Sequence, residues 1–400
     1  MERIIDAEHL YSNIKELLEK QNDIEEVRKQ LGIIHLRILQ RDVMKRTKER
    51  DCTKELVVYN KIAFYLLTKL TNFEYDEAVY FEGMEIAAFC FEVLFKTKMY
   101  KPQEEVEYGF FSSICYALAE NQANSIIMAN KVLDNYEEYC ITGRYIYLYI
   151  LFLARKYKKL SRMVVVDDTV IKEIVRFSKS MIYRNEKKNY LNGLEDVLFQ
   201  LRNEESEDYY MFRLIYLVAK RMDICSIRNL LIDNSELVDY IDVLTQKEIR
   251  NVFELWQSQK FLFDAMEQIK ETENIFFLSL PTSAGKTLVS ELILYKFLSY
   301  KRGIAIYIVP TIALTNEIEN SFIRRFRKVG INVIKELEYD DESSIAKPAI
   351  LILTPEKLDL LVRKQPEVLE ELECIVFDEF HKISDGQRGW LEETLIAWFV

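Results

Sequence analysis

The first 250 residues of this 400-residue chain contain very little proline and glycine. They hold one proline, Pro102, and five glycines, whereas the last 150 residues hold the other five prolines. Long stretches without these residues favour helices, and frequent breakers are typical of alternating strands and helices. The chain is also long for a single domain. The uneven distribution therefore predicts two differently built regions, with a boundary near residue 250.

Other common features are missing as well. The six cysteines form no CxxC pair, which favours free, mostly buried thiols in a reducing compartment. No secretory signal opens the chain. The most hydrophobic stretch, residues 145–154, has about half the length of a membrane span and is flanked by Arg144 and Arg155. We therefore expect a cytoplasmic protein that has no membrane partner.

The chain has an excess of acidic residues, with a formal net charge of -11. This balance argues against a protein covered by positive potential, but it leaves room for a local basic groove. Arg324, Arg325, Arg327 and Lys328 form one basic cluster. Such a run is commonly a solvated helix face, and the alternative is a path for a nucleic-acid strand.

Apolar residues in the first region recur at helical spacing, for example Ile14, Leu17 and Leu18. The abundant tyrosines and phenylalanines there are typical of a core. No fixed repeat period is present. We expect residues 1–250 to form a helical accessory or docking domain, built as a bundle or as an irregular solenoid.

The pattern changes after residue 250. An amphipathic helix is predicted over 252–266, and a second one from 286 to about 300. Apolar, strand-like runs lie at 275–280, 303–309, 331–334, 349–353 and 374–377. Strands that alternate with helices indicate a parallel sheet covered by helices. The predicted fold class is therefore multidomain, with an all-α region followed by an α/β domain that contains a parallel sheet.

A phosphate-binding loop is predicted where the first of these strands runs into a helix. The loop consists of Pro281, Thr282, Ser283, Ala284, Gly285, Lys286 and Thr287. Backbone N–H groups and the positive end of the helix dipole suit a phosphate. Lys286 can reach the β- and γ-phosphates, and the Thr287 hydroxyl can ligate Mg²⁺. The general pattern has a glycine where this chain has Leu280, so a plain helix-opening turn is the alternative.

A second motif, Asp378-Glu379, follows the last predicted strand. Ligands of open α/β sheets bind at the carboxyl ends of the strands. Asp378 is placed to hold Mg²⁺, directly or through water, and Glu379 is placed to orient and deprotonate the attacking water. An isolated pair of this kind would more commonly cap a helix. Together with the upstream phosphate loop, it predicts hydrolysis of a nucleoside triphosphate.

With His381 completing the Asp-Glu-Phe-His motif, residues 251–400 resemble the first motor domain of a superfamily 2 helicase. The DExH type and its Ski-like branch are the most similar. The resemblance implies a RecA-like fold and an ATP site that includes His381 and Gln259. Gln259 lies in a Trp-Gln-Ser-Gln segment at the adenine-reading position, where an amide can pair with both N6 and N7. The alternative for Gln259 is a helix-surface residue.

The same resemblance implies contacts with a single-stranded tract of DNA or RNA. The residues at the matching positions are Pro310, Thr311, Thr354, Pro355, Glu356, Arg388 and Gly389. Hydroxyls and free N–H groups at helix starts suit phosphates. Ile312 stands where the family usually has a basic residue, so a direct phosphate contact there is not expected.

The family moves along a strand by closing two motor domains on ATP. The second domain supplies arginines that stabilise the transferring phosphate. The present sequence stops before the family's third motif, so we expect a C-terminally incomplete helicase portion that does not unwind duplexes alone. An alternative is an ATPase sensor whose helical region recruits a nuclease, as in bacterial anti-phage systems such as the Hachiman type. A nucleotide-binding scaffold without motor output is a third hypothesis.

Overall fold

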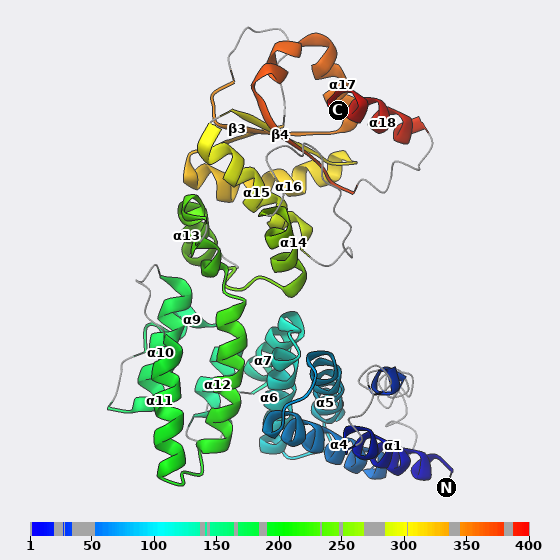
Figure 1. Cartoon of the computed structure of the whole chain (residues 1–400), viewed down its shortest axis with the longest axis vertical. Coiled ribbons are helices and arrows are strands. Elements are labelled where there is room, and N and C mark those ends of the chain that lie inside the picture. Colours follow the sequence, from blue (N-terminus) through cyan, green and yellow to red (C-terminus); the bar gives the residue numbers. More distant parts are fainter. Residues whose placement is uncertain are drawn as a thin grey trace. The chain divides into compact units, whose positions relative to one another are not determined.

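The computed structural model describes residues 2–19, 27, 29–33, 53–136, 141, 145–163, 167–183, 190–232, 234–247, 251–267, 285–301, 303–335, 345–379 and 387–399. The chain divides into two compact units, Met1–Ile224 and Cys225–Val400 (Figure 1). The predicted boundary near residue 250 thus lies inside the second unit. Among the described residues, no helix is long and apolar enough to cross a membrane.

The first unit is helical. Its helices are α1 (Glu2–Glu19), α4 (Thr53–Asn72), α5 (Glu77–Thr97), α6 (Pro102–Leu118), α7 (Gln122–Asn135), α8 (Ile146–Leu153), α9 (Tyr157–Leu160), α10 (Thr169–Ile182), α11 (Tyr190–Asn203) and α12 (Tyr209–Ile224). Most of them pack against their chain neighbours: α5 contacts α4 and α6, and α6 contacts α7. α12 also packs against α6. The apolar run at 145–154 forms the buried helix α8.

Aromatic rings fill much of the core of the first unit. Phe91 stacks on Phe111 with ring centroids 5.4 Å apart and meets the edge of Phe64 at 5.0 Å. α6 approaches its neighbours closely because Gly109 has no side chain. A Cβ at Gly109 would lie 2.4 Å from a methyl group of Val132. The sequence places large rings and a glycine where adjacent helices have to interlock.

The second unit begins with short helical turns and continues as an α/β domain. Its elements are 3-10 helices at Ile227–Ile232, Ser235–Leu237, Arg327–Val329 and Pro366–Glu371, a π-helix at Val243–Lys247, helices α13 (Val238–Asp242), α14 (Gln257–Glu267), α15 (Lys286–Lys301), α16 (Ile312–Phe326), α17 (Pro355–Lys364) and α18 (Gln387–Phe399), and strands β1 (Ile304–Ile308), β2 (Asn332–Ile334), β3 (Ala349–Leu353) and β4 (Leu372–Phe377). The predicted strand at 275–280 lies outside the described residues.

The four described strands are parallel, in the order β2-β3-β1-β4. Alternate residues of β1 point to opposite faces. Tyr307 joins a core with Phe322 of α16, and Ile306 joins a core with Leu358 of α17. Helices α15 and α16 therefore cover one face of the sheet, and α17 and α18 cover the other (Figure 1). These features confirm the predicted fold class of a helical region plus a parallel α/β domain.

Residues 225–247 belong to the second unit because their backbone pairs with the segment that leads into α14. Ile227 N–H donates to the carbonyl of Phe253 at 3.0 Å, and Leu255 N–H donates to the carbonyl of Cys225 at 2.8 Å. Val252 N–H donates to the carbonyl of Leu244 at 3.1 Å. The predicted amphipathic helix at 252–266 accordingly starts only at Gln257, because the backbone of residues 252–255 pairs with residues 225–244.

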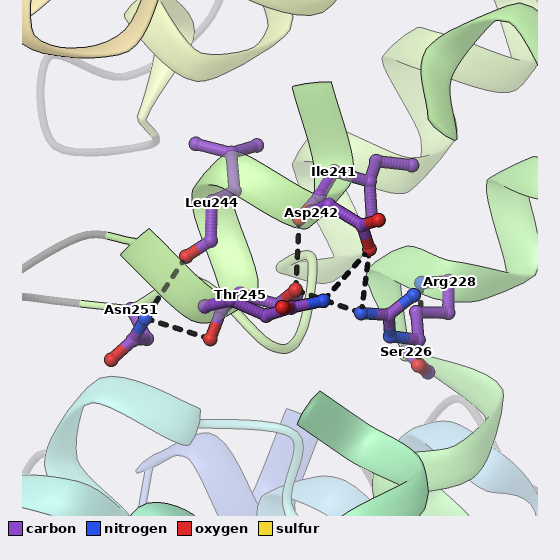
Figure 2. Close-up of polar contacts among 8 residues, drawn as sticks. Ser226, Arg228, Ile241, Asp242, Leu244, Thr245 and Asn251 are labelled. Atoms are coloured by element: carbon purple, nitrogen blue, oxygen red, sulfur yellow. Dashed lines mark hydrogen bonds and ion pairs between the residues drawn. The ribbon is translucent and has the colours of Figure 1, made fainter. Parts of the chain in front are cut away.

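Side chains reinforce this pairing (Figure 2). Arg228 donates to Asp242 at 3.1 Å and to the hydroxyl of Thr245 at 2.9 Å. Asn251 donates to the carbonyl of Thr245 at 2.7 Å. These bonds join the 3-10 helix at Ile227–Ile232, the π-helix at Val243–Lys247 and the segment before α14. We call the described residues of 225–255 the clasp.

The clasp contacts a buried ion pair between α15 and α16, the helices that cover one face of the sheet. Arg325 of α16 donates to the Glu291 carboxylate of α15 at 2.6 Å, and the Tyr240 hydroxyl of α13 donates to the same oxygen at 2.6 Å. Tyr240 also stacks on Tyr295 and Phe326, with ring centroids 4.9 Å apart in both pairs. A buried carboxylate needs such partners, because leaving it unpaired costs roughly 3 to 5 kcal/mol.

The described cysteines are free thiols. Cys90, Cys115 and Cys225 are buried, and Cys374 of β4 is partly buried. Burial raises the pKa of Cys374 to about 12, so this thiol stays protonated near neutral pH. These side chains act as small core residues.

Candidate nucleotide site and nucleic-acid edge

The structure brings the predicted adenine-reading glutamine to the end of the phosphate loop. Gln259, in the first turn of α14, is buried, and its Nε2 donates to the carbonyl of Gly285 at 3.1 Å. Its Oε1 accepts from the N–H of Trp256 at 2.9 Å. An amide carries a second hydrogen and a second lone pair, so it can still engage the edge of a base. The alternative of a solvated helix-surface residue does not fit this burial.

Gly285 is suited to its position in two ways. Its φ is 70°, in the left-handed region that glycine adopts without strain. A Cβ there would lie 2.1 Å from Nε2 of Gln259. The backbone carbonyl can approach the amide only because the side chain is absent. This close contact fixes the distance between the α14 segment and the start of α15.

Lys286 and Thr287 occupy the first turn of α15, and both are half-buried. The N–H groups of this turn and the helix dipole point to a site for an anion. α15 packs against both β1 and β4. Lys286 and Thr287 therefore begin a helix that packs on β4, the strand that Asp378 directly follows. Pro281, Thr282, Ser283 and Ala284 lie outside the described residues.

Asp378 follows β4 directly, and the structure fixes both oxygens of its carboxylate. Its N–H donates to the carbonyl of Ile308 at 2.9 Å, which extends the β1–β4 pairing by one residue. Oδ1 accepts from the N–H of Glu379 at 2.9 Å. Oδ2 accepts from the hydroxyl of Tyr307 at 3.0 Å. The carboxylate is thus held at the carboxyl edge of the sheet with one protein donor on each oxygen.

Tyr307 is a site residue that the sequence motifs did not identify. The signal was present, because Tyr307 is the one polar side chain in the apolar strand β1 and comes three residues before Pro310. Burial is the larger cause that raises the pKa of Tyr307 well above its usual value, and the negative charge of the nearby Asp378 carboxylate is the smaller cause. The hydroxyl therefore stays protonated and serves as a donor.

Glu379 has a strained backbone. Its φ of 54° lies in the left-handed region, which a residue with a Cβ adopts at a cost of about 1 to 2 kcal/mol. Strain of this kind concentrates at functional sites, where the surroundings hold an unfavourable conformation. Glu379 stands next to the proposed magnesium ligand, at the predicted position of a water-activating carboxylate.

The oxygen donors suit a magnesium ion that is bound together with a nucleotide. Among the described residues, no group of three or more His, Cys, Asp or Glu side chains could hold a metal alone. Mg²⁺ in nucleotide sites typically uses one or two protein ligands, and substrate phosphates and water complete the shell. The Thr287 hydroxyl and the Asp378 carboxylate are ligands of this type.

The residues after β1 that are predicted to contact nucleic acid lie at the same end of the sheet as Asp378, where the carboxyl ends of the strands meet. Pro310 and Thr311 connect β1 to α16, and the Thr311 hydroxyl caps α16 by accepting from the N–H of Leu314 at 3.3 Å. Ile312, in the first turn of α16, is 71% exposed. Because the Ile312 side chain is apolar, the polar groups available to a nucleic-acid strand at this point are those of Thr311 and of the start of α16.

The residues predicted after β3 are adjacent to this position. Val309 N–H donates to the carbonyl of Leu353 at 2.9 Å, so β1 and β3 end side by side. Thr354 is buried at the N-cap of α17, where its side chain makes no capping bond. Pro355 opens the helix, and Glu356 is exposed in its first turn. The ends of β1 and β3 thus present two helix starts at one edge.

The last group of predicted residues is described only in part. Arg388 and Gly389 lie in the first turn of α18, where the structure describes the backbone. His381 lies outside the described residues. Strand β1 stands between β3 and β4 in the sheet, so one edge carries both the nucleotide-side residue Asp378 and the helix starts at Thr311 and Thr354.

Comparison with known proteins finds a similarity to helicases in the second unit. Residues 263–398 match the family described as DEAD/DEAH box helicase. This match confirms the superfamily 2 helicase part of the predicted resemblance. No solved structure gives a significant match to the chain.

Two of the similar curated proteins come from Thermoplasma species. The ATP-dependent DNA helicase Hel308 of Thermoplasma volcanium is 38% identical over 150 residues, which cover 37% of this chain and 21% of that protein. The protein of the same name from Thermoplasma acidophilum is 36% identical over the same share of each chain. The present chain therefore spans about a fifth of the length of these relatives.

A third relative aligns with the helical region as well. The Hachiman protein HamB of Bacillus cereus is 27% identical over 359 residues. The alignment covers 80% of this chain and 30% of that protein. Because the second unit holds less than half of the residues, a match of this extent has to include much of the first unit.

Proposed function

We propose that the second unit is the first motor domain of an ATP-dependent helicase or translocase that acts on DNA or RNA. The observation that carries this proposal is the convergence at one sheet edge. The end of β4 holds Asp378, and the adjacent ends of β1 and β3 open helices at Thr311 and Thr354. An ATP site and a strand-binding surface that share one central strand can influence each other directly.

The nucleotide would be held by groups from three elements. The amide of Gln259 would read the adenine, and Lys286 together with the N–H groups at the start of α15 would hold the phosphates. Thr287 and Asp378 would hold Mg²⁺. The bound ion would offset the charge that develops on the transferring phosphate. Glu379 would orient a water and accept its proton.

The nucleic-acid strand would run across the helix starts at the same edge. Thr311 offers a hydroxyl, and the first turns of α16 and α17, the latter preceded by the buried Thr354, offer N–H groups to phosphates. Pro310, Pro355 and Glu356 shape these starts, and Arg388 and Gly389 stand in the first turn of α18. Contacts of this kind position a strand without reading its sequence.

The test is ATP binding and hydrolysis with and without single-stranded DNA, duplex DNA and RNA. We expect the 400-residue chain to bind a fluorescent ATP analogue in a Mg²⁺-dependent manner, and we expect one of the polymers to change that affinity. Absence of nucleotide binding would contradict the proposal.

A second candidate is an ATPase that acts as a sensor and recruits an effector such as a nuclease through its helical unit. The similarity to the Hachiman protein HamB, which extends into that unit, favours it. This candidate places the chain in an anti-phage system. It predicts that ATP hydrolysis responds to nucleic acid only when a co-purified partner protein is present. Equal stimulation without that protein would contradict it.

A further inference from the structure

The hydroxyl of Tyr307 occupies an unusual place in the sheet. Tyr307 lies in the central strand β1, is 1% exposed and is surrounded by aliphatic residues of its own strand. Its hydroxyl donates to Oδ2 of Asp378 at 3.0 Å, although the two residues are 71 positions apart in the sequence. A polar group in the middle of a core has to find a partner, because an unsatisfied hydroxyl is destabilising.

The register of the sheet explains how the two groups meet. Tyr307 is paired with Val376 in the parallel β1–β4 ladder. Residues two apart in a strand share a face, so Asp378 lies on the same side of the sheet as Val376 and two residues nearer the carboxyl ends of the strands. The long tyrosine side chain spans this distance. A shorter side chain at position 307 would not reach the carboxylate.

The ring itself is held in place. It meets Phe322 of α16 edge-on, with ring centroids 5.2 Å apart and planes at 67°. The ring thus packs on α16 while its hydroxyl reaches the carboxylate that follows β4.

The contact fixes the orientation of a carboxylate that would otherwise rotate. Oδ1 of Asp378 accepts one N–H, from Glu379, and Oδ2 accepts one O–H, from Tyr307. Each oxygen keeps further lone pairs for a metal ion or for metal-bound water. Groups that orient a metal ligand without touching the metal commonly change metal affinity tenfold or more, by about 10- to 100-fold.

We propose that Tyr307 is a positioning residue for the magnesium–nucleotide complex. It sets the direction of the Asp378 carboxylate relative to Thr287 at the start of α15. This inference rests on the proposed function, since it assumes that Asp378 serves Mg²⁺. It goes beyond that function because it assigns the geometry of the site to a buried strand residue, Tyr307, and to its hydrogen bond with Asp378.

The substitution Tyr307→Phe tests the inference, because it removes only the hydroxyl and keeps the ring against Phe322. The measurement is the binding of a fluorescent ATP analogue to the full chain during a titration with Mg²⁺. We expect the Mg²⁺ concentration for half-maximal binding to rise about tenfold. Binding without Mg²⁺ should stay unchanged, because Tyr307 would act only through the metal ligand.

Tyr240→Phe is the matched control. Tyr240 is also buried in the second unit and also donates to a buried carboxylate, that of Glu291, but it stands outside the proposed site. We expect Tyr240→Phe to lower the melting temperature and to leave the Mg²⁺ titration unchanged. If both variants shift the titration equally, a general loss of rigidity explains the effect and the positioning role is refuted.

A double-substitution cycle adds a second measurement. In a chain that carries Asp378→Asn, the further change Tyr307→Phe should not alter Mg²⁺ dependence, because the group that Tyr307 orients is no longer a carboxylate. An additive effect would overturn the inference. If the unsubstituted chain shows Mg²⁺-dependent binding but Tyr307→Phe does not differ from it, only this inference fails. If the unsubstituted chain shows no Mg²⁺-dependent binding, the proposed function fails first.

Discussion

The two units of this chain differ in where the bonds of their buried hydroxyls lie. In the helical unit, buried hydroxyls close gaps between neighbouring helices: Ser112 donates to the carbonyl of Ala88 at 2.9 Å, and Ser113 donates to the carbonyl of Ser125 at 2.8 Å. In the second unit, the buried hydroxyls of Tyr240 and Tyr307 end on carboxylates. The second kind also occurs in the helical unit, where the Tyr116 hydroxyl donates to Glu92 at 2.6 Å, but in the second unit one such carboxylate, Asp378, lies at the proposed site.

The consequence is that the units should respond differently to substitution. The helical unit has large rings packed between helices, so a change in its core should reduce stability. The second unit gathers Lys286, Asp378 and Thr311 at the ends of strands and the starts of helices, where a side chain contributes little to the core. A change there should alter ligand binding and leave the fold intact. The following experiments test that contrast, in order of decreasing expected effect.

The largest effect is expected for Phe91→Ala in the helical unit. Phe91 is fully buried and packs on Phe111 and Phe64, so its removal leaves a cavity among rings. We expect a loss of about 3 to 5 kcal/mol in the free energy of unfolding. Urea unfolding of the full chain, followed by circular dichroism, measures it.

The matched control is Phe199→Ala, the same substitution at a residue of α11 that is 65% exposed. Its effect should stay within about 0.5 kcal/mol. Comparable losses at both positions would mean that burial does not decide stability in this unit, and the contrast between the units would break down. We expect the two units to unfold in separate transitions. MgATP should shift only the transition of the unit that binds it, because a ligand stabilises the folded state to which it binds.

Lys286→Ala should have the next largest effect, on ATP turnover. Removal of a fixed cationic group from a site where negative charge develops typically costs roughly a hundredfold to a thousandfold in rate. The melting temperature should not change, because Lys286 is half-buried in the first helical turn. ATP hydrolysis is measured with the nucleic acid that stimulates it most. Lys364→Ala, at an exposed position in the last turn of α17, is the control and should retain full turnover.

Tyr240→Phe tests whether the clasp, residues 225–255, belongs energetically to the second unit. Loss of a hydroxyl that donates to a buried carboxylate should cost about 1.5 to 3 kcal/mol. The loss should appear in the transition that MgATP shifts. Tyr300→Phe, at a highly exposed tyrosine of α15, should have no effect. A loss confined to the other transition would contradict the division of the chain at residue 225.

The smallest effect is expected for Thr311→Ala. The Thr311 hydroxyl caps α16, and loss of such a cap costs about 1 kcal/mol. If the same hydroxyl faces a nucleic-acid strand, affinity for that strand should also fall by about fivefold. Asp76→Ala removes a comparable cap, that of α5 in the helical unit. It should cost similar stability and leave strand affinity unchanged, as measured by fluorescence anisotropy.

Much of the second unit was predictable from the sequence because its signals are local. Residues 349–353 form β3 as predicted, and the helix predicted from Lys286 runs to Lys301. The boundary near residue 250 followed the composition, whereas the contacts divide the chain at residue 225. The reason is that most described residues of 225–247 are helical like the region before them, and long-range contacts join them to the second unit: the pairing with residues 251–255 and the contacts of Tyr240 with α15 and α16.

The residues at the site divide in the same way. Gly285, Lys286, Asp378 and Glu379 stand in motifs with a chemical meaning, so the sequence alone points to them. Tyr307 has no motif, because its role depends on a partner on another strand. The contact between Gln259 and Gly285 likewise joins residues 26 positions apart. Motif spacing names such residues, but it does not say which atoms touch.

The sequence by itself predicted a helical region followed by an α/β domain, the apolar runs that form β1 to β4, and the residues of the proposed nucleotide site. These follow from hydrophobic period, from breakers and from local motifs. The tertiary structure decided which chain segments form one unit, that the Asp378 carboxylate is oriented by Tyr307, and that Glu291 is balanced by Arg325 and Tyr240. The physical reason is that a buried polar group is satisfied by whichever partner the strand register and helix packing bring to it, and that partner is set by long-range contacts.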